Sequence, residues 1–216
     1  TEVIKADNSV WAWGQSIYDG AVSPWYIPQR ITELSNIIAL ESGSNHGLVL
    51  KSDGTVWTWG NQASNALGRG SISGEAGVPH QVINLENIIS IGAGYISSFS
   101  VGADGSTWSW GYSIYGELGK GAPFYIAKPQ QVLDLTDVKK ITLRTLLKKD
   151  GTIWAWGNNL YGQLGSGFKN GIANDRAYGY ATVPVIGIDD AIDISSSAAN
   201  SLAIKVDGTV WAWGGN

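Results

Sequence analysis

The chain has no cysteine and no methionine among its 216 residues. Without cysteine it can form no disulfide, and it has no thiolate ligand for a metal and no thiol nucleophile. It also lacks a run of about 18 apolar residues, the length that a membrane-spanning helix requires. These absences exclude thiol chemistry, and we expect no insertion into a membrane.

Positive charge is scarce as well. The sequence has 14 Lys and Arg against 18 Asp and Glu, which gives a formal net charge of −4. Proteins that bind nucleic acids need clustered basic side chains to neutralise the phosphates. The densest basic stretch here comprises only Lys139, Lys140, Arg144, Lys148 and Lys149. We therefore expect no nucleic-acid partner.

Histidine is limited to His46 and His80. Neither has a repeated carboxylate spacing beside it, and no Gly-x-Ser-x-Gly motif marks a nucleophilic serine. His46 falls at the turn between two expected strands, where a structural role is the favoured interpretation. The sequence predicts no catalytic residue, no cofactor and no enzyme activity.

Tryptophan, by contrast, is abundant and regularly placed. The string Trp-x-Trp-Gly occurs five times and contains ten of the eleven tryptophans. The first tryptophans of successive copies are 46, 51, 46 and 57 residues apart. A fixed period of this length indicates a repeat architecture. The repeat frames are centred on Trp11, Trp57, Trp108, Trp154 and Trp211.

Each repeat is expected to contain four short strands. In the second repeat, alternation of apolar and polar residues predicts strands over 36–40 and 46–51. Asp53-Gly54 then predicts a two-residue hairpin turn, because Asp-Gly tolerates the positive φ that such turns demand. Strands over 55–59 and 79–83 complete the unit. Four strands at a period near 50 predict an all-β fold, a β-propeller of four-stranded antiparallel blades.

A glycine-rich loop follows each Trp-x-Trp-Gly. Five residues after the motif glycine the sequence has Asp19, Asn65, Gly116 and Gly162. Gly, Asn and Asp are the residues that enter left-handed backbone conformations most readily. We therefore expect a positive φ at this position of the loop.

The stretch DGTIWAWGNNLYGQLG, residues 150–165, closely resembles the repeat of the regulator of chromosome condensation family, and the match extends over nearly the whole chain. The resemblance implies blades of a propeller, usually seven in that family. It also implies a structural role for His46, because repeats of the family often carry histidine at that position. The resemblance says little about activity, since one fold hosts many functions.

The repeats do not fill a ring of seven blades. Residues 1–216, taken as a single repeat domain, contain about 4.5 blades, beginning at a second strand and ending just after a third. We expect a fragment of, or a partial ring from, a larger propeller, whose closure uses missing blades or another copy; a smaller ring is the alternative. The stretch 138–147 is four residues shorter than its counterparts, and we expect it to lack their turn.

Two clusters have both a structural and a functional interpretation. Tryptophans at i and i+2 share one face of a strand, and packing between blades is favoured over a ligand-binding box. Asp189, Asp190 and Asp193 could supply oxygen ligands to a hard cation such as calcium. The same point in other repeats is a polar turn, so a solvated turn is favoured and no metal site is expected.

Aromatic residues also lie between the repeated motifs, at comparable places in three repeats. Loops that match in frame are expected on the same side of a propeller, and a face lined by Trp, Phe and Tyr has the composition of a binding hot spot. The alternative is that these side chains fold back over the blade ends. The candidate partner-binding residues are Trp25, Tyr26, Phe124, Tyr125, Tyr178 and Tyr180, with Phe168 in the longest loop.

These features favour a non-catalytic module that binds a protein partner through its loops. The regular Asp-Gly-Thr-x-Trp-x-Trp-Gly units resemble those of bacterial extracellular members of the family, which implies a secreted or surface-attached protein. An inhibitor-like role is a special case, because a secreted β-lactamase inhibitor of the family binds through aromatic-rich loops. A guanine-nucleotide exchange factor for a small GTPase is one alternative. A hydrolase or metal-dependent enzyme on a propeller face is another.

Overall fold

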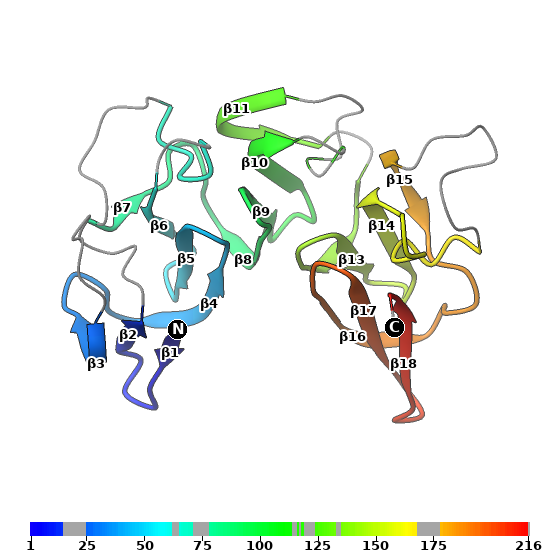
Figure 1. The fold of residues 1–216 in the computed structure, drawn as a ribbon, viewed down its shortest axis with the longest axis horizontal. Helices are drawn as coiled ribbons and strands as arrows, with labels where there is room; N and C mark the ends of the chain where they lie inside the picture. Colours follow the sequence, from blue (N-terminus) through cyan, green and yellow to red (C-terminus); the bar gives the residue numbers. More distant parts are fainter. Residues whose placement is uncertain are drawn as a thin grey trace.

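The computed structural model of the chain describes residues 1–14, 25–61, 65–70, 78–113, 116, 118, 124–132, 135–167 and 178–215. Within these ranges the fold is all-β, and the strands form five antiparallel sheets. We number the sheets as blades 1 to 5 in chain order. Figure 1 shows them side by side in an open arc, a partial β-propeller, with the two ends of the chain facing each other across the opening.

The blades have the following strands. Blade 1 has β1 (Glu2–Ile4), β2 (Val10–Gly14) and β3 (Trp25–Ile31). Blade 2 has β4 (Ile37–Ser42), β5 (His46–Lys51), β6 (Val56–Gly60) and β7 (His80–Gln81). Blade 3 has β8 (Ile88–Ala93), β9 (Ser97–Gly102), β10 (Thr107–Ser113) and β11 (Phe124–Gln131). Blade 4 has β12 (Val138–Ile141), β13 (Thr145–Lys148), β14 (Ile153–Asn158) and β15 (Tyr178–Pro184). Blade 5 has β16 (Ala191–Ser196), β17 (Asn200–Lys205) and β18 (Val210–Gly214).

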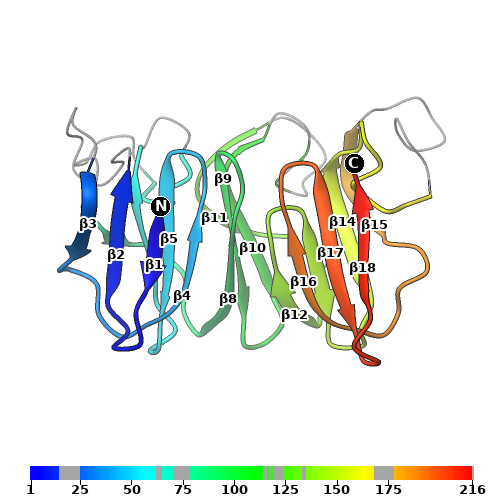
Figure 2. The same cartoon turned by 60° about the horizontal axis from the view of Figure 1, so that its bottom comes forward.

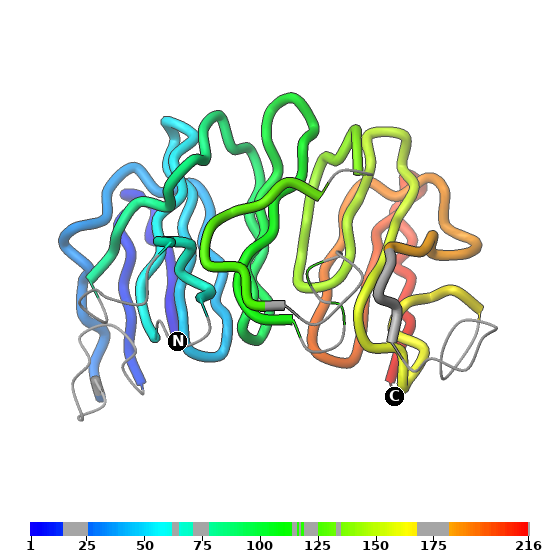
Figure 3. The backbone as a smooth tube through the Cα atoms, turned by 90° about the horizontal axis from the view of Figure 1, so that it is seen from above, coloured from blue at the N-terminus to red at the C-terminus, as the bar shows by residue number. Residues whose placement is uncertain are grey.

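Strands within each blade are hydrogen-bonded in chain order. The first strands of blades 2 to 5, β4, β8, β12 and β16, lie nearest the centre of the arc, and β7, β11 and β15 lie at its outer rim (Figure 1). The view from above in Figure 3 shows the same curved row of sheets. The strands predicted over 36–40, 46–51, 55–59 and 79–83 correspond to β4, β5, β6 and β7.

The two ends of the blades differ in their connections, as Figure 2 shows. At one end, which we call the Asp-Gly end, tight turns join the second strand to the third. Oδ1 of Asp53 accepts hydrogen bonds from the backbone N (2.9 Å) and Oγ1 (2.6 Å) of Thr55. These bonds lower the pKa of the Asp53 carboxyl, chiefly the one from the Thr55 hydroxyl. The same turn recurs at Asp7, Asp104, Asp150 and Asp207.

At the opposite end, the loop end, each third strand has the motif glycine as its last residue or within two residues of its end. This glycine has a positive φ in every copy, for example +112° at Gly60 and +108° at Gly111. A Cβ at Gly111 would lie 2.5 Å from the carbonyl oxygen of Ile96, in the turn before β9. The register between β10 and β11 also shifts between Ser109 and Gly111. Glycine is therefore required there both by the backbone angle and by the close approach of the neighbouring turn.

The loop residues expected to have positive φ fit this geometry. The φ angles are +59° at Asn65, +81° at Gly116 and +80° at Gly162, which confirms the prediction at these three positions. Asp19 lies outside the described residues. The turn that begins at Asn65 buries Leu67 completely and so fixes the start of the loop to the blade.

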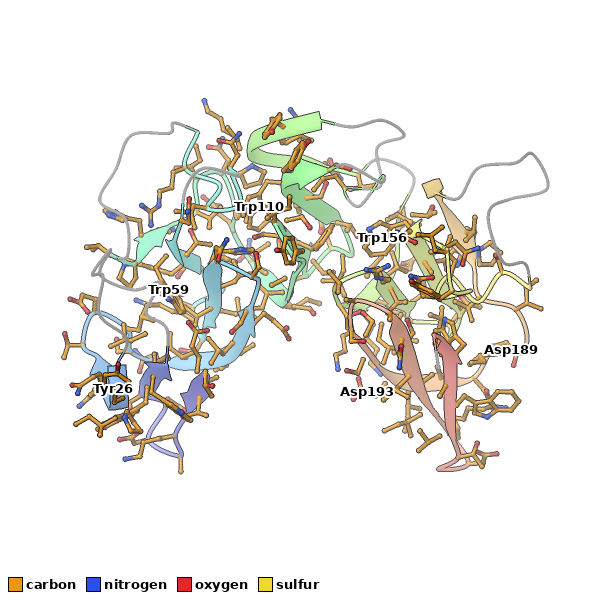
Figure 4. The ribbon with its side chains drawn as sticks, viewed as in Figure 1. Tyr26, Trp59, Trp110, Trp156, Asp189 and Asp193 are labelled. Atoms are coloured by element: carbon orange, nitrogen blue, oxygen red, sulfur yellow. The ribbon has the colours of Figure 1, made fainter. Side chains whose placement is uncertain are left out.

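The second tryptophan of the motif joins successive blades. Nε1 of Trp110 donates a hydrogen bond to the carbonyl oxygen of Ala66 in the loop of the preceding blade (2.7 Å), and Nε1 of Trp213 donates to that of Gln163 (3.0 Å). A Cβ at Gly165 would lie 2.9 Å from Nε1 of Trp213, so the Leu-Gly of one repeat makes room for the tryptophan of the next. Trp59, Trp110 and Trp156 are buried between blades (Figure 4).

The first tryptophan of the motif has a different environment. Trp57 is half-buried, and its Nε1 donates to Oγ1 of Thr55 (3.2 Å) beside the Asp-Gly turn. Nζ of Lys51 lies 4.1 Å from the centroid of the Trp57 ring, a cation–π arrangement. Similar contacts occur at Trp11, Trp154 and Trp211. Both tryptophans are thus packing residues, as predicted, and in blades 3 and 5 the second one also forms a hydrogen bond to the preceding blade.

The hairpin β12–β13 corrects the expectation for residues 138–147. It keeps a three-residue turn, in which Thr142 N donates to Thr145 O just as Gly43 N donates to His46 O in blade 2. The deficit of four residues lies in the strands, which have four residues each instead of the six of β4 and β5. Losing two residues from each strand preserves the alternation of inward and outward side chains, so the blade retains its core.

His46 is a buried interblade residue, in line with its predicted structural role. Its Nε2 lies 3.0 Å from Oγ of Ser98 in blade 3, and the same hydroxyl donates to the carbonyl oxygen of Ala66 (2.8 Å). Burial lowers the pKa of His46 to about 4, although a hydrogen bond with the backbone of Ser97 opposes the shift. The imidazole is therefore neutral in the folded protein at pH 7.

This pKa predicts that the fold loses stability as the pH falls below 6.5. Between pH 6.5 and about 4 the unfolded state binds a proton at His46 that the folded state does not, so the free energy of unfolding falls. The loss attributable to His46 is about 2 kcal/mol on going from pH 6.5 to 5. It is measured by urea unfolding at several pH values, with His46→Gln as the non-titrating control.

The control is necessary because other groups titrate in the same range. Burial raises the pKa of the Glu2 carboxyl, which adds stability as the pH falls and so opposes the effect of His46. This contribution is common to both proteins and cancels in the difference between them. Parallel pH profiles for the wild type and His46→Gln would rule out His46 as the source.

Candidate partner-binding face

Strand register brings the aromatic residues predicted in three repeats to the loop end. Trp25 pairs with the motif residue Gly14 in blade 1. Tyr125 pairs with Tyr112 in blade 3, one residue after the motif glycine, and Tyr178 pairs with Asn158 at the equivalent place in blade 4. The backbone positions therefore match to within two residues, as the loops' common frame predicts.

Two of the predicted side chains are described, and both point into solvent. Tyr26 is 88% exposed at the outer rim of blade 1, where Figure 4 labels it. Tyr125 is also exposed, and its ring stacks on that of Tyr112 with centroids 4.1 Å apart and an interplanar angle of 12°. Stacking of this kind orders a tyrosine before any partner arrives, which lowers the entropic cost of binding.

The remaining predicted residues are described only in part. Phe168 lies outside the described residues. The backbones of Trp25, Phe124, Tyr178 and Tyr180 belong to β3, β11 and β15, but their side chains lie outside the description. The structure thus places these four residues at the loop end by their strand positions alone.

The structure adds exposed residues that sequence reasoning missed. Tyr95 occupies the β8–β9 turn, where its carbonyl oxygen accepts hydrogen bonds from the backbone N (3.0 Å) and Oγ (2.6 Å) of Ser44. Leu160 and Tyr161 lie in the loop after β14 and are exposed as well. Tyr161 was overlooked because it belongs to the repeated motif, which was interpreted as scaffold. The sequence marks Tyr161 only by its place beside Leu160 and Gly162 in the glycine-rich loop.

Tyrosine is segregated to the loop end. The chain has nine tyrosines, and the seven in the described ranges all lie at this end. The Asp-Gly end carries instead the five turn aspartates and the lysines that cover the first tryptophans. The two ends of the arc therefore offer a partner different surfaces, one with tyrosines and the other with charged side chains around the first tryptophans.

A second feature is an open hollow of about 450 Å³ near the centre of the arc, lined by residues of blades 2 to 5. Its wall combines hydroxyl groups, charged groups and aliphatic side chains from β4, β12, β16 and β17. Nζ of Lys140 lies 2.5 Å from Oδ1 of Asp193 within it, and both side chains are partly exposed. Thr142 and Leu143 of the short β12–β13 hairpin line its rim.

The three aspartates considered as calcium ligands do not converge. Asp193 pairs with Lys140, and Oδ1 of Asp190 lies 3.1 Å from Nζ of Lys205. Asp189 is directed away from Asp193 (Figure 4). Across the described ranges, no three His, Asp or Glu side chains form a group that could hold a metal ion. Over those same stretches, no helix has the length and apolarity to cross a membrane.

Two family models match the chain, and both are described as the Regulator of chromosome condensation (RCC1) repeat. One matches residues 37–66, and the other matches 53–101 and 150–204. Together they cover more than half of the chain, including most of blades 2, 4 and 5.

Curated relatives share this repeat. The chain is 31% identical over 242 residues to Protein pim1 of Schizosaccharomyces pombe, an alignment that covers 99% of the chain and 44% of pim1. It is 26% identical over 236 residues to the E3 ubiquitin-protein ligase HERC2 of Mus musculus, covering 99% of the chain and 5% of HERC2. The chain thus spans less than half the length of either relative.

Solved structures agree on the fold. Human WBSCR16 superposes with a TM-score of 0.79 at 19% identity, over 98% of this chain and 58% of that one. Prp20p of Saccharomyces cerevisiae, whose structure was described together with its binding to Gsp1p and histones, gives a TM-score of 0.76 at 21% identity, over 95% and 54%. At such identities the agreement concerns the fold alone.

Proposed function

Because the chain belongs to the regulator of chromosome condensation (RCC1) repeat family, we propose that it is a non-catalytic module that binds a protein partner on the loop end of its blades. The observation that carries the proposal is the segregation of tyrosine to that end. Tyrosine supplies a large contact area with few rotatable bonds, and it is enriched among residues that dominate binding energy.

The geometry supports this proposal in two further ways. The candidate residues are anchored on β3, β10 and β11, so the scaffold holds the contact surface in place. Exposed Tyr26 and the stacked pair Tyr112–Tyr125 belong to blades 1 and 3, and Tyr161 to blade 4. A partner that spans several blades could contact all of them at once, whereas a small ligand could not.

We further propose that the protein is bacterial, that it acts outside the cell or at the cell surface, and that an inhibitor-like role is one form of its binding. The support is the resemblance of its regular Asp-Gly-Thr-x-Trp-x-Trp-Gly units to those of bacterial extracellular members of the family. Cell fractionation with an antibody against the chain tests the location, and an exclusively cytosolic signal would reject it.

A second candidate function is nucleotide exchange on a small GTPase. It is favoured by the shared fold of Prp20p, a protein studied for its binding to Gsp1p and histones. Against it, no stretch within residues 1–216 matches an exchange wedge. Accelerated release of bound GDP from a small GTPase in the presence of the chain would favour this alternative.

The double variant Tyr26→Ala/Tyr125→Ala is expected to lose the partner. Each exposed tyrosine at a hot spot contributes about 1–2 kcal/mol, so the double variant should bind at least tenfold more weakly. The immobilised chain is incubated with bacterial or host extract, and the retained proteins are quantified by mass spectrometry. Both side chains are solvent-exposed, so the fold should be unaffected.

Val206→Ala is the matched control, because Val206 is an exposed apolar residue at the Asp-Gly end. It should retain the partner at the wild-type level. If the double tyrosine variant also retained the partner in full, the loop end would not be the binding face. Loss in both variants would point to a surface elsewhere on the arc.

A further inference from the structure

In four of the five blades a lysine covers the first tryptophan of the motif. It lies two residues before the turn aspartate, and its Nζ is 4.1 to 5.4 Å from the centroid of the ring. Hydrogen bonds within the turn are the main cause of the low pKa of each turn aspartate, and the charge of the lysine lowers that pKa further. One lysine therefore stabilises both an aromatic face and a carboxylate. The pairs are Lys5–Trp11, Lys51–Trp57, Lys148–Trp154 and Lys205–Trp211.

Blade 3 has glycine in place of this lysine. The backbone N of Gly102 donates to the carbonyl oxygen of Ser106 (2.8 Å), as that of Lys51 donates to Thr55 (2.9 Å), so the two positions are equivalent. The rest of the unit is retained, since Nε1 of Trp108 donates to Oγ of Ser106 (3.1 Å). Over the described ranges, no lysine or arginine lies above the Trp108 ring, so this ring lacks the cation that its four counterparts have.

An open hollow of about 500 Å³, which we call the Trp108 hollow, lies against this glycine and this tryptophan at the Asp-Gly end. Two exposed acidic side chains, Glu86 and Asp104, belong to its wall, and none of the described residues that line it is basic. The backbone N of Ala103 donates to the carbonyl oxygen of Asn87 (2.9 Å), which ties the turn after β9 to the connection before β8. The fold therefore holds this part of the wall in place before any ligand arrives.

The charge of the Trp108 hollow favours a cation. Hydrogen bonds from the side chain and backbone of Ser106 lower the pKa of Asp104, with a lesser contribution from the charge of Lys149, which does not line the hollow. Asp104 is therefore ionised at pH 7, and its own repeat supplies no lysine beside it. An aromatic face next to carboxylates attracts an ammonium group, whose N–H groups the carboxylates accept. A primary ammonium suits the hollow better than a quaternary one, which has no N–H to donate.

We propose that the Trp108 hollow binds the side chain of a lysine that a partner protein presents. The ammonium group takes the place above the Trp108 ring that the chain's own lysines take in the other blades, within reach of the carboxylates of Glu86 and Asp104. Because the hollow is open, the main chain of the partner can remain outside it. The site lies at the Asp-Gly end, so this inference goes beyond the binding proposed for the loop end and does not depend on it.

The test is a titration of the full chain followed by nitrogen-15 NMR, in which the indole N–H signal of Trp108 and the backbone amide signal of Gly102 are observed. The probe is the peptide acetyl-Gly-Lys-Gly-amide. Its control replaces lysine with norleucine, which has a similar hydrocarbon stem but no ammonium group. We expect both signals to shift saturably with the lysine peptide, and the norleucine peptide to bind at least about tenfold more weakly.

The variant Gly102→Lys fills the Trp108 hollow with a lysine of the chain itself, and it should weaken binding of the lysine peptide at least about tenfold. A Cβ at Gly102 would lie 2.6 Å from Oδ1 of Asp104 and 2.7 Å from Oγ of Ser106, both at the ends of side chains. The four blades that carry lysine here form the same turn, so the fold should accommodate the change. Val206→Lys is the matched control, because it adds the same charge at an exposed position of the blade 5 turn. It should leave binding within about twofold of wild type.

A second variant does not alter the backbone. Glu86→Gln replaces an exposed carboxylate of the wall by a neutral amide of the same shape and should weaken binding about threefold. It keeps the proposal testable even if Gly102→Lys does not fold, which far-ultraviolet circular dichroism would show.

Four results would overturn the proposal. The first is the absence of a saturable shift at Trp108 and Gly102 with the lysine peptide. The second is equal binding of the norleucine peptide, which would make the hollow an apolar site. The third is wild-type binding by a folded Gly102→Lys variant or by Glu86→Gln. The fourth is binding of pentylamine at least about tenfold more tightly than the peptide, which would make a free amine the ligand in place of a partner protein.

Discussion

Replacing Trp110 with alanine is expected to lower the free energy of unfolding by about 4 kcal/mol. Trp110 is fully buried between blades 2 and 3 and belongs to the largest apolar cluster. Its removal leaves a cavity the size of an indole and also removes the hydrogen bond to Ala66. Urea unfolding followed by far-ultraviolet circular dichroism measures the loss.

Two further variants separate the contributions of the ring and of the hydrogen bond. Trp110→Phe keeps most of the apolar volume but has no Nε1 donor, and Ser98 still donates to the Ala66 carbonyl. Its expected cost is about 1–2 kcal/mol. Trp211→Ala removes a first-position tryptophan that is 47% exposed and should cost less than Trp110→Ala. Equal losses at Trp110 and Trp211 would contradict the distinct roles assigned to the two positions.

The second large effect is expected for Gly111→Ala, which should lower the free energy of unfolding by about 3 kcal/mol. The new Cβ would sit in a backbone with φ of +108°, only 2.5 Å from the carbonyl oxygen of Ile96 and 2.8 Å from the Cα of Ser97. Both contacts are with backbone atoms of the neighbouring turn, so relief requires a shift of the β8–β9 hairpin. The same unfolding measurement applies.

Gly187→Ala is the matched control for that variant. Gly187 also has a positive φ, +86°, but a Cβ there would meet nothing within 4 Å. Gly187→Ala is therefore expected to lower the free energy of unfolding by about 1 kcal/mol, the cost of placing alanine at a positive φ. The difference between the two variants measures the clash. If both cost the same, the motif glycine would be required by its φ alone and not by the approach of the turn.

Much of the fold could be predicted because its signals are local. Strand 46–51 has the predicted bounds, since alternation and the Asp-Gly turn define both of its ends. Strand β4 begins and ends one and two residues later than predicted, at Ile37 and Ser42. The positive φ at Asn65 follows from residue chemistry within one turn. Because the motif recurs in every repeat, the same local signal is seen several times, which strengthens the prediction of the fold.

Features that depend on pairing could not be predicted in the same way. The deficit of four residues near Leu143 was assigned to the turn, because a single sequence does not say which residues remain paired. Only the register of Val138 and Ile141 with β13 shows that the strands shortened. Likewise, the exposure of Leu202 depends on which blade lies beside it, and nothing in the residues Leu, Ile and Val distinguishes it from Leu48.

Matching frames predicted comparable positions for Trp25, Tyr125 and Tyr178, and strand register gives them equivalent positions in blades 1, 3 and 4. Their role in binding a partner stays a prediction. Tyr95 was missed because it sits in a hairpin turn that had been interpreted only as a connection. Its link to Ser44 joins residues 51 positions apart, a relation that no short window of sequence contains.

The anchored start of each long loop has a consequence for engineering. In blades 2 and 4 the four residues Asn65–Gly68 and Gly162–Gly165 bury a leucine and present a carbonyl to the next blade's tryptophan. In blade 2 the junction extends to Gly70, whose backbone N donates to the carbonyl oxygen of Ala127 in blade 3 (2.8 Å). The repeats differ most in length beyond this anchor. Foreign peptide segments could therefore be grafted after Gly70 or Gly167, beyond the contacts that align the blades, which makes the arc a frame for building new recognition surfaces.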